Sequence, residues 1–265
     1  VARYLKNPEK TFKLGKKRRS KLDPFKPVIN EYLETDLTVG APVILRKIRD
    51  KGYLGGITIL QEYLKKTRGQ TKQKTAFIRF ESEPGEDFQI DSGHFGAIIY
   101  GNTKRKLYAL AVIESYSRML YIEFTHSQKQ EVLQGCLFNA IKYFGGTPKK
   151  IVVDNMVTAV ISRAGHLVRF NDAFLDFLRP FHILPRACNI RAPFEKGKIE
   201  NSIKYLRRNF MPLREFDDLT DIQTQVLDWL DQVANARIHQ TTGMIPKERF
   251  GTVKLKPIPP LIKVP

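Results

Sequence analysis

The chain has 265 residues, a length that suits about one or two domains and at least one hydrophobic core. It carries 45 lysines and arginines against 27 aspartates and glutamates, a net charge of +18, and its 42% hydrophobic content is too high for a disordered chain. The longest apolar stretches have only the length of strands, which excludes a membrane-spanning helix. The two cysteines, Cys136 and Cys188, lie outside any Cys/His cluster, so neither a disulfide framework nor a structural zinc site is supported. We therefore expect a folded, basic, cytoplasmic protein.

Basic residues are concentrated at the start of the chain. Residues 1–80 hold 20 basic residues against 7 acidic ones. Residues 1–23 lack apolar periodicity and are predicted to form an extended linker arm, whose positive charge is densest at Lys16, Lys17, Arg18 and Arg19. A solvated linker or a localisation signal is one interpretation of this arm. Contact with the phosphate backbone of DNA is the other, and the strongly basic chain favours it.

Three short helices are expected next, over residues 24–68. Apolar residues recur at helical spacing over 24–34, 41–51 and 57–66, and Gly52 follows the second helix as a C-cap. Two short helices joined by a glycine-bearing turn are typical of a helix-turn-helix DNA-binding domain. On its outer face the last helix would present to DNA the side chains of Thr58, Gln61 and Lys65. A three-helix unit with a purely structural role is the alternative.

Past a polar linker over 69–85, the hydrophobic period changes from that of a helix to that of a strand. We expect four short strands, at 88–91, 95–100, 106–114 and 119–125, separated by turns at Ser92-Gly93, Gly101-Asn102 and Ser115–Ser117. A helix at 130–144, a buried strand at 150–154, a short helix near 171–178, a strand at 182–187 and a long helix over about 194–211 would follow. Strands that precede an alternation of strands and helices predict an α/β fold, a mixed sheet with helices on its faces.

Three carboxylates stand where a purely structural role is hard to explain. Asp91 ends one predicted strand and Asp154 ends the buried one, and functional sites form at strand ends in open α/β sheets. Glu200 lies on the long helix, close to the basic residues Lys196, Lys204 and Arg207. Three converging carboxylates suit Mg²⁺, and the neighbouring cations would hold a polyanion.

The sequence around these acids resembles the DDE motif of the retroviral-integrase and transposase superfamily. The matching segments are Gln89-Ile-Asp91, Val153-Asp154-Asn155 and Lys196-Gly-Lys-Ile-Glu200-Asn201. The resemblance implies a ribonuclease-H-like catalytic domain over 86–215, followed by a helical closure over 216–250 that includes Trp229. With the basic arm and the helix-turn-helix ahead of it, the chain looks most like an IstA-type transposase of bacterial insertion sequences.

That resemblance implies metal-dependent cleavage of a donor DNA strand and its transfer into target DNA. Asp91, Asp154 and Glu200 would be the catalytic residues and the ligands of two Mg²⁺ ions, for which Mn²⁺ substitutes. The implied partners are double-stranded DNA at the element ends and in the target, further copies of the chain on DNA, and an AAA+ ATPase helper. An earlier helix-turn-helix would precede residue 1, and 251–265 would be a proline-rich connector within a longer protein.

Two features depart from the family pattern. Ser92 follows Asp91 where an aromatic residue is frequent, and the 45 residues between Asp154 and Glu200 imply an insertion around Val157–Asp172, expected to be a loop or a short helix. Two other functions stay open. A structure-selective nuclease of the same fold would cleave DNA but not join it, and a non-catalytic DNA-binding regulator would do neither.

Overall fold

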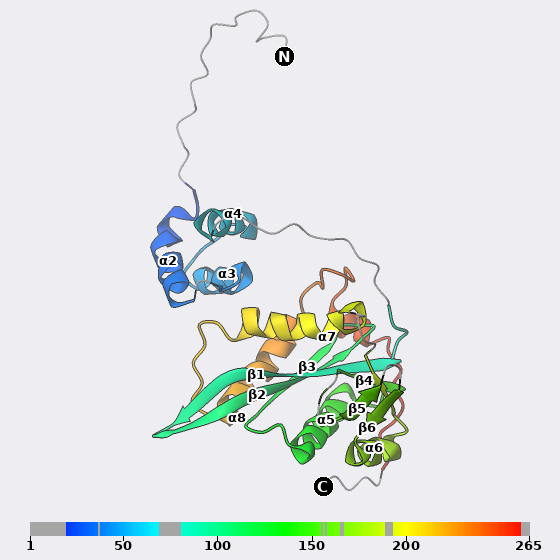
Figure 1. Ribbon diagram of the computed structural model, residues 1–265. Coiled ribbons are helices and arrows are strands. Elements are labelled where there is room, and N and C mark those ends of the chain that lie inside the picture. The colour runs from blue at the N-terminus through cyan, green and yellow to red at the C-terminus, as the bar shows by residue number, and fades with distance from the viewer. Residues whose placement is uncertain are drawn as a thin grey trace, which may run out of the picture. The chain divides into compact units, whose positions relative to one another are not determined.

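The computed structural model describes residues 20–36, 38–68, 81–154, 156, 158–164, 167–188 and 193–260, and the chain divides into two compact units, 1–71 and 72–265 (Figure 1). The side chains of residues 163, 164, 167 and 193–196 are outside this description. So is the part of the basic arm that contains Lys16, Lys17, Arg18 and Arg19.

The smaller unit consists of a short 3₁₀ turn, η1 (Asp23–Phe25), and three helices, α2 (Lys26–Thr35), α3 (Ala41–Arg49) and α4 (Ile57–Arg68). Its core combines aliphatic residues from all three helices, namely Ile29, Leu33, Ile44, Ile48, Leu60 and Leu64. The turn between α3 and α4 folds around buried Tyr53, whose hydroxyl donates to the carbonyl of Gly56 at 3.1 Å. Gly55 has no room for a side chain, because an added Cβ would lie 2.2 Å from the Tyr53 hydroxyl. The three predicted helices are therefore present.

The larger unit is built on a five-stranded sheet with the strand order β3-β2-β1-β4-β7. Three strands pair antiparallel, β1 (Asp87–Tyr100), β2 (Thr103–Glu114) and β3 (Leu120–Thr125). Two more run parallel to β1, β4 (Lys150–Val153) and β7 (Leu184–Ala187). Helices cover both faces, which confirms the predicted mixed α/β sheet with flanking helices.

The first two predicted strands are one continuous strand, β1, so the turn expected at Ser92-Gly93 is wrong. Both residues have partners on β2. The irregularity comes later, where the register shifts between His94 and Ala97, and Gly96 there has φ +88°. Because β2 pairs with β1 on both sides of this shift, the small residues that suggested a turn lie within a strand that contains a bulge.

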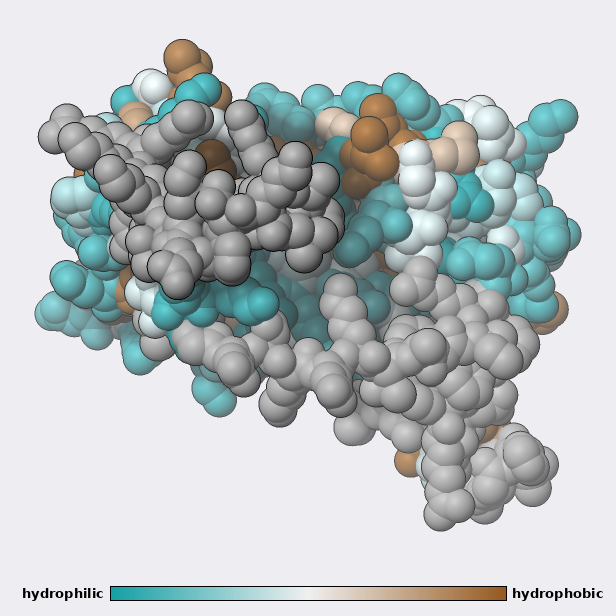
Figure 2. Space-filling model, turned by 90° about the horizontal axis from the view of Figure 1, so that it is seen from above, coloured by the Kyte–Doolittle hydropathy of each residue, from teal (hydrophilic) through white to brown (hydrophobic). Residues whose placement is uncertain are grey.

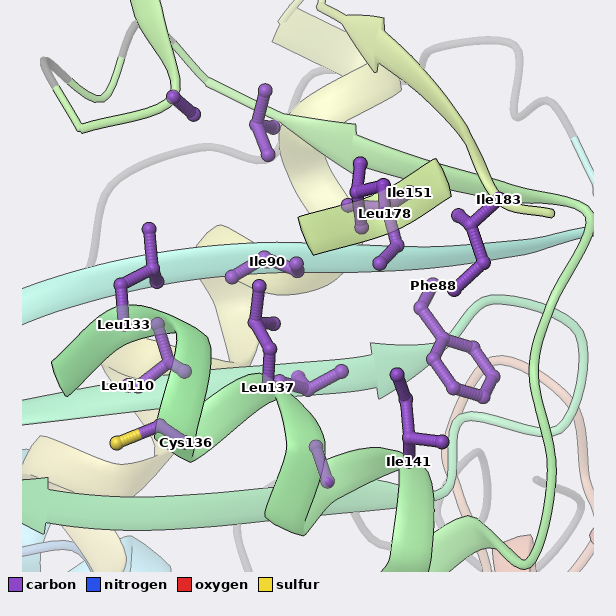
Figure 3. Packing of buried hydrophobic residues seen from close by; sticks show 14 of the residues in the cluster. Phe88, Ile90, Leu110, Leu133, Cys136, Leu137, Ile141, Ile151, Leu178 and Ile183 are labelled. Atoms are coloured by element: carbon purple, nitrogen blue, oxygen red, sulfur yellow. The ribbon is translucent and has the colours of Figure 1, made fainter. Parts of the chain in front are cut away.

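One face of the sheet packs against α5 (Gln130–Phe144) and α6 (Asp172–Leu178), which continues into a 3₁₀ turn, η2 (Arg179–Phe181). In Figure 3, Leu137 and Ile141 of α5 lie against β1 near Ile90 and Phe88. The predicted helix at 130–144 is confirmed to the residue. Gly145 ends it in the left-handed conformation, with φ +73°, as a helix C-cap requires.

The other face packs against α7 (Pro193–Tyr205) and α8 (Leu219–Trp229), each of which continues into a π-helical turn, η3 (Leu206–Phe210) and η4 (Leu230–Ala234). A short helix, α9 (Pro246–Phe250), follows. The core on this side includes Ile199, Ile203, Phe210 and Trp229, and the Trp229 indole donates to Asn209 Oδ1 at 3.1 Å. The predicted long helix is therefore α7 with its π-helical end.

Side-chain amides cover the outer edge of β3. Asn235 accepts from the Leu120 N–H and donates to the Leu120 carbonyl, both at 2.9 Å. Gln223 accepts from the Phe124 N–H at 2.9 Å and donates to the Ile122 carbonyl at 3.3 Å. These bonds replace a neighbouring strand, so that the edge does not offer these groups to another chain.

The insertion expected as a loop or short helix contains a two-stranded hairpin, β5 (Val160–Ala164) and β6 (Leu167–Phe170), so that expectation is wrong. Val160 is buried in the core on the α5 side, and Phe170 packs against it. This contact with residues far away in the sequence holds the short strands in place. The hairpin is followed by α6, whose N-cap Asn171 accepts from the Ala173 N–H at 2.9 Å.

The described helices include none with the length and hydropathy of a membrane span. In Figure 2, hydrophilic residues (teal) cover most of the described surface visible in that view, and hydrophobic residues (brown) are scattered. Such a surface suits a charged, hydrated partner.

Candidate active site

Two of the three predicted acids stand side by side on neighbouring strands. In the parallel pair of β1 and β4, Ile90 is the register partner of Val153. The next residues along the two strands are Asp91 and Asp154, both half-buried. They therefore stand at the same level of the sheet, on strands that lie about 4.8 Å apart.

The third acid lies on the helix that covers the same face. Ile90 belongs to the core under α5, so the next side chain of β1, that of Asp91, points to the opposite face, which α7 covers. Its partner on β2, Ala111, lies in the core together with Ile199 of α7. Glu200 follows Ile199 directly and is half-buried. The fold thus brings the three acids to one end and one face of the sheet.

Their side chains are engaged with neighbours in this structure. Asp91 Oδ1 accepts from the Ser92 N–H at 2.9 Å, and Glu200 accepts from Lys204 Nζ at 2.7 Å, one helical turn away. Among the residues that the structure describes, no three Asp, Glu, His or Cys side chains lie close enough to hold a metal ion. A cation at this site would have to draw the carboxylates together and replace Lys204 at Glu200.

The predicted cations of α7 differ in their surroundings. The exposed Arg207 lies over the Phe95 ring, 4.2 Å from its centroid, and donates to the His94 carbonyl at 2.7 Å. Gly93 leaves space for it, because an added Cβ would come within 3.1 Å of Arg207 Nη2. Lys204 is exposed and pairs with Glu200. The side chain of Lys196 is outside the described residues.

Sequence reasoning overlooked Lys198, two residues before Glu200. Its ammonium donates to Ser82 Oγ at 2.8 Å, on the segment that leads into β1. Burial lowers the pKa of Lys198, and the positive charge of Arg118 lowers it further. Side chains two positions apart on a helix point about 200° away from each other. Lys198 therefore anchors one side of α7, and Glu200 lies on the other side. The only sequence signal for this role is the position of Lys198 in the same short run as Glu200.

A second group of acids lies at the other end of the β1–β4 pairing, at the start of β1 and the end of β2. Glu114, fully buried, accepts through Oε1 from the N–H groups of Gly85 and Tyr116, at 3.3 and 3.2 Å. Its Oε2 accepts from the N–H and the hydroxyl of Ser117, at 2.6 and 2.5 Å. Buried Asp87 accepts from the Ser115 hydroxyl. These carboxylates hold together the start of β1 and the turn between β2 and β3.

A cavity of about 470 Å³ opens beside the candidate site, on the α5 face of the sheet. Ser92 and Met156 line it, and each lies one or two residues beyond a predicted catalytic acid. Gln128 donates to Ser92 Oγ at 3.2 Å. Ser92, the departure from the family pattern, therefore lines a space that a bulky aromatic side chain would partly fill.

In the smaller unit, the predicted DNA-facing residues share one face of α4. Thr58, Gln61 and Lys65 are exposed, while Leu60 and Leu64 are buried on the opposite side. Intervals of three and four residues place the exposed trio in one row along the helix. This row lies on the side of α4 that faces away from the core of the unit.

Comparison with known proteins gives a consistent set of relatives. Residues 81–193 match the family model described as the integrase core domain. The transposase for insertion sequence element IS640 from Shigella sonnei is 32% identical over 250 residues, which cover 94% of this chain and 78% of that protein. The transposase for IS21 from Pseudomonas aeruginosa is 32% identical over 262 residues, 98% of this chain and 66% of that protein. A protein of element IS5376 from Geobacillus stearothermophilus is 38% identical over 98% of this chain. The chain spans 65% of the length of that protein.

Two solved structures were also similar. One is the intasome of simian T-cell lymphotropic virus in complex with the PP2A regulatory subunit B56 gamma, with a TM-score of 0.47 and 14% identity over 92% of this chain and 79% of that chain. The other is the catalytic core domain of HTLV-2 integrase in complex with magnesium, with a TM-score of 0.42 and 16% identity over 64% of this chain and 99% of that chain.

Proposed function

We propose that this chain is a DNA transposase of the IstA type. It belongs to the family of insertion-sequence transposases with an integrase core domain. It binds the terminal repeats of a bacterial insertion sequence, cleaves a donor strand at each end in a metal-dependent reaction, and transfers the new end into target DNA. It acts in the cytoplasm, where that DNA lies.

One observation carries this proposal. Asp91 follows Ile90 on β1, Asp154 follows Val153, which is the register partner of Ile90 and the last residue of β4, and α7 covers the same face with Glu200 next to buried Ile199. Glu114 is fully buried and accepts four hydrogen bonds, as a carboxylate that serves the fold does. Half-buried acids where the β1–β4 pairing ends remain within reach of a ligand, for which they can exchange their present neighbours.

The donor atoms suit Mg²⁺. Three carboxylates offer the hard oxygen ligands that this ion prefers, and it binds through a few of them together with substrate phosphates. Buried Gln89, two residues before Asp91 on the same face of β1, has an Oε1 atom without a hydrogen-bond partner among the described residues. When bound, two Mg²⁺ ions, or Mn²⁺ in their place, activate the attacking water or 3′-hydroxyl and stabilise the leaving oxygen.

The residues of this chain have separable roles in the reaction. Asp91, Asp154 and Glu200 hold the metal. Lys204, with Arg207 and Lys196, would hold phosphates of the DNA strand. Lys198 positions α7 and does not touch the substrate.

The direct test is strand transfer with duplexes that carry a pre-cut terminal repeat. In Mg²⁺ or Mn²⁺, the wild-type chain joins these ends to plasmid DNA, and Asp154→Asn does not. Cleavage of DNA without any joining would support the structure-selective nuclease instead. Sequence-specific binding with neither reaction, at any metal concentration, would support the DNA-binding regulator.

The smaller unit is proposed to be a helix-turn-helix domain over 24–68, with the arm over 1–23 along the DNA backbone and a linker over 69–85. Its α4 row of Thr58, Gln61 and Lys65 reads the element ends. Gln61→Ala then reduces the preference for terminal repeats over random DNA, by about 1–3 kcal/mol for each base that the helix no longer reads. Equal losses on both kinds of DNA would count against base readout by α4.

Paired-end insertion requires at least two chains, because each chain has a single carboxylate trio. We therefore expect homo-oligomers on DNA, assembled with an AAA+ ATPase helper. Mixing a chain inactivated at Asp154 with one altered at Gln61 and Lys65 tests catalysis in trans. Recovery of paired-end joining supports this arrangement, and loss without recovery despite normal assembly means that each chain serves the end it binds.

A further inference from the structure

Beyond the candidate site, the sheet narrows to a two-stranded ribbon. β4 pairs with β1 only from Asp87 to Ile90, and β3 pairs with β2 only from Tyr108 to Ile113. Residues 95–107, which we call the ribbon, extend past these pairings as a hairpin of β1 and β2. Figure 1 shows this hairpin projecting beyond the other strands of the sheet.

The tip of the ribbon is strongly basic. Lys104, Arg105 and Lys106 follow one another and are all exposed. The sequence from 92 to 113 contains no aspartate or glutamate. Within the part of the chain that the structure describes, none of the three cations takes part in a salt bridge. Their charge is therefore available to an anionic ligand.

Hydrogen bonds fix the ribbon to the rest of the unit. The His126 ring bridges it, because Nδ1 donates to the Lys106 carbonyl at 2.8 Å and Nε2 bonds the Tyr100 hydroxyl at 2.9 Å. The same hydroxyl accepts from the Leu219 N–H at the start of α8, at 3.0 Å. An acid of this region, Asp218, is the N-cap of α8, where it accepts from a backbone N–H at 2.8 Å. The ribbon thus holds its cations at a fixed distance from the five-stranded part of the sheet.

That distance matches a length of duplex DNA. The register partners of Lys106 and Lys104 on β1 are Ala97 and Ile99, six and eight residues beyond Asp91. Because of the bulge in β1, the count is one residue shorter along β2, where Lys106 and Lys104 lie five and seven residues from Ala111, the partner of Asp91. Strand residues are about 3.3 Å apart, so the cations lie roughly 17–23 Å from the acid. With a phosphate every 3.4 Å along each DNA strand, this distance corresponds to about five to seven base pairs.

A cationic path connects the two places. α7 runs along β1 in the direction of the ribbon (Figure 1), and Arg207 reaches the His94 carbonyl between Asp91 and the ribbon. Resting on the proposed function, we infer that the ribbon tip binds the phosphate backbone of duplex DNA about five to seven base pairs from the phosphate that reacts at the carboxylates. The duplex is either the donor end or the target, and both offer the same backbone.

The test compares the wild-type chain with the variant Lys104→Gln, Arg105→Gln, Lys106→Gln. The plot of log K against log salt has a negative slope, and removing three cations that bind phosphates reduces its magnitude by up to about 2.7. Donor and target duplexes are then shortened separately, from about 20 to about four base pairs beyond the reacting phosphate. For one of them, the ratio of wild-type to variant affinity falls to about one once fewer than about five base pairs remain, because contacts of the smaller unit with the DNA are lost equally from both proteins.

The matched control removes the same charge at the other end of the sheet, where residue 256 pairs with Thr147. Lys142→Gln, Lys254→Gln, Lys256→Gln changes three exposed lysines there. It leaves the length dependence of the wild type intact. The inference is overturned if the ribbon variant has the same salt slope as the wild type or as the control variant. It is also overturned if the ratio of wild-type to ribbon-variant affinity depends on neither duplex length. If the wild type cuts and joins no DNA, the proposed function fails, while these binding measurements still decide the role of the ribbon.

Discussion

Two groups of acids lie at opposite ends of the short β1–β4 pairing, which runs from Asp87 to Ile90, and their surroundings separate structure from chemistry. Glu114 and Asp87 are buried, and donors of the chain itself satisfy their oxygens. Asp91, Asp154 and Glu200 are half-buried at the other end, with Glu200 held by an exposed lysine. A buried acid with a full set of local donors stabilises the fold, whereas a partly exposed group of acids can exchange its neighbours for a ligand. Variants at the two ends should therefore fail in different ways.

The largest effect is expected at the exposed end. Asp91→Asn, Asp154→Asn and Glu200→Gln each remove a charge that is proposed to hold the metal. Metal assistance is worth several kcal/mol in the transition state, so we expect joining to fall by about 10³-fold or more. DNA affinity and the midpoint of thermal unfolding stay close to those of the wild type. Steady-state joining assays and calorimetry check both halves of this prediction. Full activity in any one variant removes that residue from the site.

Next in size is the effect of Glu114→Gln at the buried end. The new amide nitrogen faces N–H groups that the carboxylate accepted from, so about 2–3 kcal/mol of folding free energy is lost. Chemical denaturation measures this loss as a lower midpoint at an unchanged slope. Activity per folded molecule stays normal below the unfolding transition. Loss of activity without loss of stability would erase the contrast between the two ends.

Lys198 links the two ends, and its removal should show a mixed effect. Lys198→Met keeps the length of the side chain but loses the bond to Ser82, so α7 is less firmly positioned and kcat falls by about tenfold. Lys198→Arg restores part of the loss because it keeps the donor. Single-turnover joining rates, measured alongside DNA affinity, test this. A loss confined to DNA affinity would place Lys198 on the DNA and not in the support of α7.

The smallest effect concerns Glu86, which pairs with Lys150 at 3.0 Å, next to the buried acids but near solvent. The hydrogen bond from Lys150 lowers the pKa of Glu86, and the backbone N–H of Glu83 adds to this. A lowered pKa gives stability that is present above the unfolded value of about 4.3 and lost as the pH falls through the folded value. Glu86→Gln should cost less than about 1 kcal/mol at pH 7 and nothing at low pH, as denaturation at several pH values can show.

The comparison of the two ends also shows where sequence reasoning stopped. Asp87 and Asp91 both belong to the same strand, and local sequence gives no measure of burial that would tell them apart. The acid Asp91 stood out because it closes an apolar run and matches a known motif. Lys198 lies in the same matching segment as Glu200, but its supporting role did not stand out, since its partner Ser82 lies 116 residues away.

The sequence alone determined the features that depend on neighbouring residues. The helix from Gln130 to Phe144 has its apolar stripe and its glycine cap within one short segment, and the strand Lys150–Val153 is a compact apolar run. Tertiary structure decided the rest. Pairing with β2 made one strand of a stretch that contains Ser92 and Gly93, contact with the core held the β5–β6 hairpin, and strand register aligned Asp91 with the residue after Val153. These outcomes rest on contacts between distant segments, whose energies no short stretch of sequence contains.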